Sequence, residues 1–234
     1  MIELKNLVKT FGNKRAVDGI SFTINRGEVF GLLGKNGAGK TTTIKMLTMQ
    51  LEPTSGEIFF EGHPVRGNEI FVKSLLGLVP QHLNFDLDLT VEENMELHAR
   101  LHHLPKDERR KRIDELLNFV ELSKVRAASI RELSGGMKRR LLIVRALIHH
   151  PKILLLDEPT VALDPQVRRK IWELITELKA QGITIILTTH YIEEAEFLCD
   201  RVAILNCGKL VALDTTENLC AGCSLEEKFI ELTK

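Results

Sequence analysis

The chain has 234 residues, 44% of them hydrophobic, and its 32 lysines and arginines balance its 32 aspartates and glutamates. That length is ample for a buried core, and a net charge of zero argues against a broad basic surface for nucleic acid. No apolar run approaches the ~20 residues that span a bilayer, and the start MIELKNLVKTFG lacks a secretory pattern, so we expect a soluble cytoplasmic protein without a nucleic-acid partner.

Short apolar runs alternate with longer helical patterns along the chain, which is typical of an α/β domain with a largely parallel sheet. Trp172 lies at helical spacing with its apolar neighbours and is therefore predicted to belong to the core. In chain order, the pattern predicts a strand over 28–34, a helix over 41–50, a strand over 152–160, a helix over 165–181, strands over 182–190 and 200–206, and a further short strand after a turn at Cys207-Gly208.

The middle of the chain, from about 82 to 150, has a mostly helical pattern. Pro105 and a turn near Ser134 interrupt it. We expect this segment to form a helical subdomain inserted into the α/β core.

The segment GKNGAGKT at 34–41 has the form of a phosphate-binding loop between a strand and a helix. Glycines let backbone N–H groups turn inward around an anion, and the start of the next helix adds unpaired N–H groups and a positive dipole end. Lys40 would reach the β- and γ-phosphates, and Thr41 would ligate Mg²⁺. We therefore expect a nucleotide to be bound by Gly34, Asn36, Gly37, Ala38, Gly39, Lys40, Thr41 and Thr42.

The segment ILLLDEP places two acids, Asp157 and Glu158, at the end of a buried strand. Side chains alternate along a strand, so adjacent acids point differently and can take different roles. We expect Asp157 to hold Mg²⁺ through its water shell and Glu158 to polarise the attacking water.

Two further residues are weak signals by themselves. His190 ends a core strand on the expected phosphate side of the sheet, although a lone histidine there is more often a surface residue. Gln81, in LGLVPQH, has a side chain that can contact a metal-bound water or a γ-phosphate. His190 becomes a candidate for catalysis through its position at the strand end, whereas Gln81 becomes one only through the resemblance described below.

The four cysteines all fall in the last part of the chain, and Cys220 and Cys223 form a CxxC pair. Such a pair suits half of a zinc site or a redox couple, but zinc needs two more converging ligands. Cytosolic chains commonly carry reduced, unpaired thiols, so we interpret these four as ordinary thiols.

A second small-residue loop lies in RELSGGMKRR, where Ser134, Gly135 and Gly136 open another expected helix. No lysine follows its glycines in the phosphate-loop position, so it is a poor independent nucleotide cradle. Its backbone N–H groups and helix start can nevertheless face an anion.

Together these segments resemble the ATP-binding subunits of ABC transporters over nearly the whole chain. The resemblance rests on the phosphate-binding loop at 34–41, on Gln81, on the signature LSGGM (133–137), on LLLDE (154–158), on ALD (162–164) and on His190. It implies a single domain over 1–234 with a P-loop NTPase core and mostly parallel sheet, an antiparallel β subdomain, and the helical subdomain at about 82–150.

The resemblance also implies roles for particular residues. Phe11 falls where an aromatic side chain, usually tyrosine, stacks on adenine, and Gln81 also becomes a metal-site residue. In this family two ATPase domains pack head to tail, so Ser134, Gly135 and Gly136 would close over ATP bound to the partner. Met137 and Val161 stand where the family most often has glutamine and serine. Ser134, Gly136 and Asp164 are retained, so we expect activity to be kept, and only the change at Val161 bears on the tuning between sites.

The expected function is ATP hydrolysis that powers a separate integral-membrane transporter subunit, to which this chain binds on the inner face of the cell membrane. A homodimer is the expected assembly. The segments EEAEFLCDRVAILNCGKLVALDT and SLEEKFIELTK look most like subunits of ABC-2 type exporters. The alternative is a soluble ABC ATPase in macromolecular assembly, such as iron–sulfur cluster biogenesis, which the clustered cysteines keep open.

Overall fold

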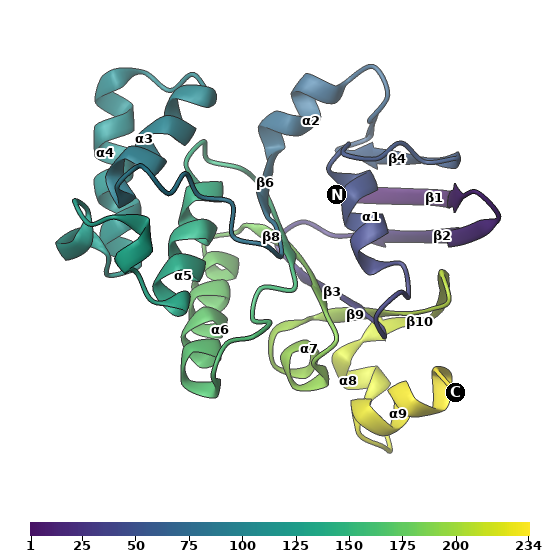
Figure 1. The fold of residues 1–234 in the computed structure, drawn as a ribbon. Helices are drawn as coiled ribbons and strands as arrows, with labels where there is room; N and C mark the ends of the chain where they lie inside the picture. Colours follow the sequence, from purple (N-terminus) through teal and green to yellow (C-terminus); the bar gives the residue numbers. More distant parts are fainter.

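The computed structural model describes residues 1–234, and its centre is a six-stranded sheet (Figure 1). The strand order is β10-β9-β3-β8-β7-β6, and every neighbouring pair is parallel except β10 with β9. All the strands predicted from the sequence are present in this sheet. Its members are β3 (Val29–Leu33), β6 (Leu76–Val79), β7 (Ile153–Asp157), β8 (Thr184–Thr189), β9 (Arg201–Asn206) and β10 (Lys209–Thr215).

A second, antiparallel sheet lies beside the first, with strand order β2-β1-β4-β5. Its strands are β1 (Ile2–Phe11), β2 (Lys14–Ile24), β4 (Ser55–Phe60) and β5 (His63–Pro64). Helix α1 (Lys40–Leu47) packs with both sheets, because Ile44 and Leu47 share one buried cluster with strands of each. The expected α/β fold with a mostly parallel and an antiparallel sheet is confirmed.

Helix α1 is shorter than the helix predicted over 41–50. It begins one residue earlier, at Lys40, and ends at Leu47. Met49 has a φ of 59°, in the left-handed region that an α-helix cannot continue through. The chain then turns toward β4.

Of the remaining helices, α2 adds its buried residues to the cluster around α1, whereas α3 to α9 contribute to the cluster on the other face of the large sheet (Figure 1). Three of them, α3 to α5, fall between β6 and β7 in the chain, where the helical segment is expected. None of the helices is both long enough and apolar enough to cross a membrane. The helices are α2 (Glu69–Leu75), α3 (Val91–Leu101), α4 (Lys106–Phe119), α5 (Gly135–Ala146), α6 (Pro165–Ala180), α7 (Ile192–Leu198), α8 (Thr216–Leu219) and α9 (Leu225–Leu232), with 3-10 turns η1 (Ser123–Val125) and η2 (Ile130–Glu132).

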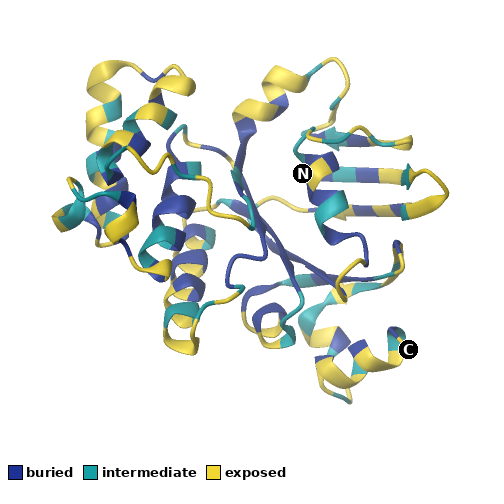
Figure 2. Ribbon diagram, viewed as in Figure 1, coloured by how far each residue is buried: buried dark blue, intermediate teal, exposed yellow.

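The large sheet divides the core into two clusters, because alternate side chains point to opposite faces. Along β3, Val29 and Leu33 belong to the cluster that includes buried residues of α3 to α9, whereas Phe30 and Leu32 belong to the cluster around α1. The strands β3, β7 and β8 are buried along their length, whereas β10 at the edge of the sheet is partly exposed and α4 and α9 expose their outer faces (Figure 2). Trp172 is 9% exposed and lies in the core, as predicted.

Candidate nucleotide-hydrolysis site

The candidate site lies at one edge of the large sheet, because the carboxyl ends of parallel strands meet there. The loop after β3 leads into α1, and the residue after β7 is Glu158. Gln81 follows β6 by two residues, and His190 directly follows β8. Four segments far apart in the sequence therefore supply side chains to one place.

The loop between β3 and α1 requires glycine at two positions for steric reasons. A Cβ on Gly34 would lie 2.6 Å from the carbonyl oxygen of Leu205. A Cβ on Gly39 would lie 2.6 Å from the carbonyl oxygen of Ala16, and its φ of 109° is outside the range of ordinary residues. Because the backbone packs this closely, the loop can turn its N–H groups toward an anion.

The ammonium group of Lys40 lies inside this loop. It donates to the carbonyl of Gly34 (2.7 Å) and lies 3.7 Å from Glu158 Oε1. Its side chain is 4% exposed. Burial lowers the pKa of Lys40, while the carboxylates of Glu158 and Asp157 act in the opposite direction. It also donates to the carbonyl of Lys35 (3.3 Å), so the loop backbone holds this buried cation where a phosphate ligand could meet it.

Asp157, at the end of β7, faces the hydroxyl groups of two threonines. Thr188 Oγ1 donates to Asp157 Oδ1 (2.6 Å), and Thr41 Oγ1 lies 3.3 Å from the same oxygen. The site thus combines the carboxylate of Asp157 at the end of β7 with the hydroxyl of Thr41 in the first turn of α1. Oxygen ligands of this kind fit Mg²⁺, which binds one or two protein oxygens together with substrate phosphates.

Glu158 is nearly buried, at 8% exposure, and three polar side chains surround its carboxylate. Gln81 Nε2 donates to Glu158 Oε2 (3.2 Å), and His190 Nδ1 lies 3.4 Å from Glu158 Oε1, the oxygen that Lys40 also approaches. The His190 contact is within ion-pair reach, but its direction does not make a hydrogen bond. Glu158 is therefore oriented from several sides, as a general base must be.

The backbone at Glu158 is held in an unusual conformation. Its φ is 49°, in the left-handed region, and its N–H donates to Thr188 Oγ1 (2.9 Å). Such a backbone costs about 1–3 kcal/mol and clusters at functional sites. The neighbouring strand β8 holds it, so Thr188 fixes both acids at once.

The Ser134–Gly136 loop begins α5 and does not join this group. The Ser134 hydroxyl accepts from the backbone N–H of Met137 (3.2 Å), so it caps its own helix. A Cβ on Gly135 would meet only Leu163 Cδ2, at 4.0 Å, whereas a Cβ on Gly136 would lie 2.6 Å from Val167 Cγ1. The loop therefore has room for a side chain at Gly135 but not at Gly136.

Phe11 lies at the end of β1 and is 50% exposed. It pairs in register with Lys14, two residues before Ala16, whose carbonyl borders Gly39. An exposed aromatic ring near the loop is the arrangement that stacking on a base requires.

The cysteines form no metal centre. Cys199 is buried and Cys207 is exposed, and all four thiols are free. No group of three or more histidine, cysteine or acidic residues could hold a metal ion.

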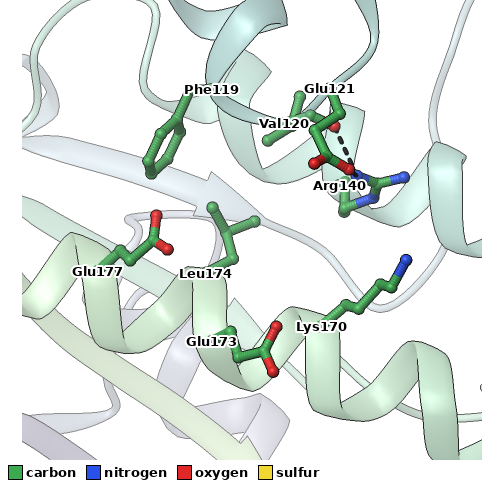
Figure 3. A pocket seen from close by; sticks show the side chains of 8 residues that line it. All are labelled: Phe119, Val120, Glu121, Arg140, Lys170, Glu173, Leu174 and Glu177. Atoms are coloured by element: carbon green, nitrogen blue, oxygen red, sulfur yellow. Dashed lines mark hydrogen bonds and ion pairs between the residues drawn. The ribbon is translucent and has the colours of Figure 1, made fainter.

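A separate cavity of about 210 Å³ lies between the end of α4, α5 and α6 (Figure 3). Glu121, Glu173 and Glu177 line it together with Arg140 and Lys170. Arg140 is paired with Glu121 at 3.6 Å. Three carboxylates oppose a polyphosphate, so this cavity is unsuited to the nucleotide.

The sequence did not indicate the roles of Thr188 and Arg139. Thr188 pairs with Asp157 across β7 and β8. The two threonines before His190 therefore indicate a site residue only once the strand register is known. Arg139 donates to the carbonyls of Pro80 and Gln81, which links α5 to the turn after β6. No local pattern indicates such a contact.

The chain is similar to proteins of one family over most of its length. The family described as "ABC transporter" matches residues 17–161. The Nod factor export ATP-binding protein I of Ralstonia nicotianae is 43% identical over 232 residues, covering 98% of this chain and 72% of that protein. The linearmycin resistance ATP-binding protein LnrL of Bacillus subtilis is 42% identical over 221 residues, covering 94% and 71%.

Solved structures show the same architecture. A dimeric, post-hydrolysis state of an ATP-binding cassette bound to ADP and Pi aligns with a TM-score of 0.82 and 31% identity. The alignment covers 92% of this chain and 98% of that one.

Proposed function

The chain belongs to the ABC transporter family of ATP-binding domains, and from that premise we propose that Glu158 is the general base of its ATP hydrolysis. The observation that carries this assignment is the convergence of Lys40, Gln81 and His190 on one nearly buried carboxylate. Glu158 accepts the proton of the attacking water, while Lys40 binds the β- and γ-phosphates. His190 and Gln81 orient the carboxylate of Glu158 and would contact the γ-phosphate of the bound ATP.

The remaining assignments complete the binding site. Thr41, Asp157 and Gln81 would hold Mg²⁺, which supplies charge neutralisation of the phosphates when bound. The loop 34–42 wraps the phosphates, and Phe11 stacks on the adenine. Support comes from the steric need for glycine in the loop and from the oxygen ligands at the first turn of α1.

The active assembly is a head-to-tail homodimer in which Ser134, Gly135 and Gly136 complete the partner's site. The contacts of the Ser134–Gly136 loop support this arrangement, because the capping bond uses the N–H of Met137 and leaves the N–H groups of Gly135 and Gly136 to meet an anion. A related cassette was solved as a dimer with ADP and Pi. Hydrolysis would remove the γ-phosphate that joins the subunits and release them.

The transport partner is a separate integral-membrane subunit of an exporter. Two similar proteins carry export and resistance in their names, and no helix here could form the membrane path. The chain would bind the inner face of the membrane through that partner, using the helical subdomain at about 82–150 within its single domain. No observation favours the assembly alternative over transport.

Purification from the native membrane in mild detergent tests the proposal. We expect an integral-membrane chain to co-purify in a fixed ratio and to stimulate Mg·ATP hydrolysis. Recovery of an active ATPase with only soluble protein partners would contradict the transport assignment, and absence of ATP hydrolysis in any assembly would contradict the role of Glu158.

A further inference from the structure

The turn after β6 is held by one side chain from α5. Arg139 Nη1 donates to the carbonyl of Pro80 (3.1 Å), and Arg139 Nη2 donates to the carbonyl of Gln81 (3.0 Å). Proline has no N–H, and no other side chain bonds the backbone of these two residues. The backbone position of Gln81 therefore depends on Arg139.

Arg139 is buried, at 4% exposure, yet its hydrogen bonds go to main-chain carbonyls rather than to a carboxylate. Burial lowers the pKa of its guanidinium, and the nearby charges of Asp157 and Glu194 oppose that effect. A guanidinium has a rigid planar fork of donors, which can hold two successive carbonyls in one fixed geometry. Arg139 thus fixes the position of the Pro80–Gln81 turn relative to α5.

The same helix carries the loop that begins with Ser134, about one and a half turns before Arg139. At the other end of the contact, Gln81 Nε2 donates to Glu158 Oε2 (3.2 Å). A chain of bonds therefore runs from α5 through Arg139 to Gln81 and on to the candidate base.

We propose that Arg139 is a positioning residue that acts through Gln81, so that a shift of α5 changes how Gln81 holds Glu158. The inference rests on the proposed roles of Gln81 and Glu158. In a head-to-tail dimer, nucleotide bound by the partner contacts the start of α5. Arg139 then transmits the presence of that nucleotide to the base in its own chain.

Arg145 offers a matched control on the same helix. It is also 4% exposed, and it donates to the carbonyl of Asn84 (3.0 Å) with its guanidinium over the ring of Phe85. It binds the same loop, three residues beyond Gln81. A purely structural role would make the two arginines equivalent, whereas the proposal makes only Arg139 affect turnover.

The first measurement compares Arg139→Met with Arg145→Met in the full chain. Arg139→Met is expected to lower kcat for Mg·ATP by about 10- to 100-fold, the scale of a small misplacement of a catalytic group, with the ATP dissociation constant unchanged. We expect both methionine variants to lower Tm by a similar amount, but Arg145→Met is expected to keep kcat. Arg139→Lys retains a donor and is expected to recover part of the lost kcat. Equal effects of the two methionine variants on kcat overturn the proposal.

The second measurement is a double-mutant cycle with Gln81→Ala, which separates coupled from independent residues. If Arg139 acts through Gln81, the double variant has the kcat of Gln81→Ala alone. If Gln81→Ala is itself impaired and the double variant loses the product of the two single losses in kcat, the inference is overturned. The proposed function is left intact by that result. Full activity of Gln81→Ala overturns the role of Gln81 and the inference together. If Arg139→Met does not fold, Arg139→Lys takes its place in the cycle.

Discussion

Gly135→Asp should abolish ATP hydrolysis without disturbing the chain that carries it. A Cβ at this position meets only Leu163 Cδ2 at 4.0 Å, and an acid at the first turn of a helix stabilises it by about 0.3–1 kcal/mol. The fold and the chain's own phosphate loop should therefore persist. Gly136 is the poorer choice, because its Cβ would strike Val167.

The expected size of the effect follows from the charge that this substitution introduces. A carboxylate at position 135 that lies about 4 Å from the γ-phosphate of the partner's ATP is repelled by about 4 kcal/mol at the effective dielectric of a protein surface. That energy lowers the equilibrium constant for forming the closed, ATP-bound dimer by roughly 10³-fold. Gly135→Asn has the same shape without the charge, so the ratio of the two variants' hydrolysis rates measures the electrostatic effect.

The assay mixes Gly135→Asp with Lys40→Ala, which we expect to be inactive because its phosphate loop lacks the lysine. Random pairing of the two chains makes about half of the dimers mixed, each with one intact site of two, so activity should recover to at most about a quarter of normal. ATP-dependent cross-linking between the chains serves as the control for assembly. The reasoning is refuted if cross-linked mixed dimers form without recovery, or if Gly135→Asp alone loses nucleotide binding as a monomer.

Three further predictions follow from the geometry. Glu158→Gln should keep ATP affinity, measured by calorimetry, while its turnover falls by about 10²–10⁴-fold; unchanged turnover would exclude Glu158 as the base. Gly39→Ala should weaken ATP binding and lower Tm, because its Cβ meets a carbonyl at 2.6 Å, and normal affinity would contradict the tight loop. Acidification should lower Tm: burial holds the pKa of His98 and of His149 at about 4, against about 6.5 unfolded. Their stabilisation is complete above pH 6.5 and is lost as the pH falls through 4. His98→Gln/His149→Gln should flatten that dependence, and an unchanged slope would assign it to other groups.

Much of the candidate site was readable from the sequence because its residues follow strand ends. The positions of the phosphate loop, Asp157, Glu158 and His190 needed only the rule that parallel strands share a carboxyl edge. Thr188 needed the register between β7 and β8, which pairs it with Asp157. Arg139 needed the packing of α5 against the turn after β6, and contacts between such distant segments leave no local pattern.

Helix ends were harder to predict than strands. The apolar spacing after Lys40 continues to Leu51, so periodicity alone extends α1 too far. The left-handed backbone at Met49 ends it instead, with the N–H groups of Gln50 and Leu51 both bonded to the carbonyl of Lys45. Such a terminus depends on where the chain must go next, toward β4.

The left-handed backbone at Glu158 has a consequence for how this chain can change over generations. Glycine or asparagine would adopt that conformation with less strain than glutamate, so either substitution would relieve the backbone while removing the carboxylate. On the proposed role of Glu158, such a variant would gain stability and lose turnover, a direct exchange of activity for stability. In a copy of the gene released from selection for turnover, either residue should therefore be tolerated at position 158.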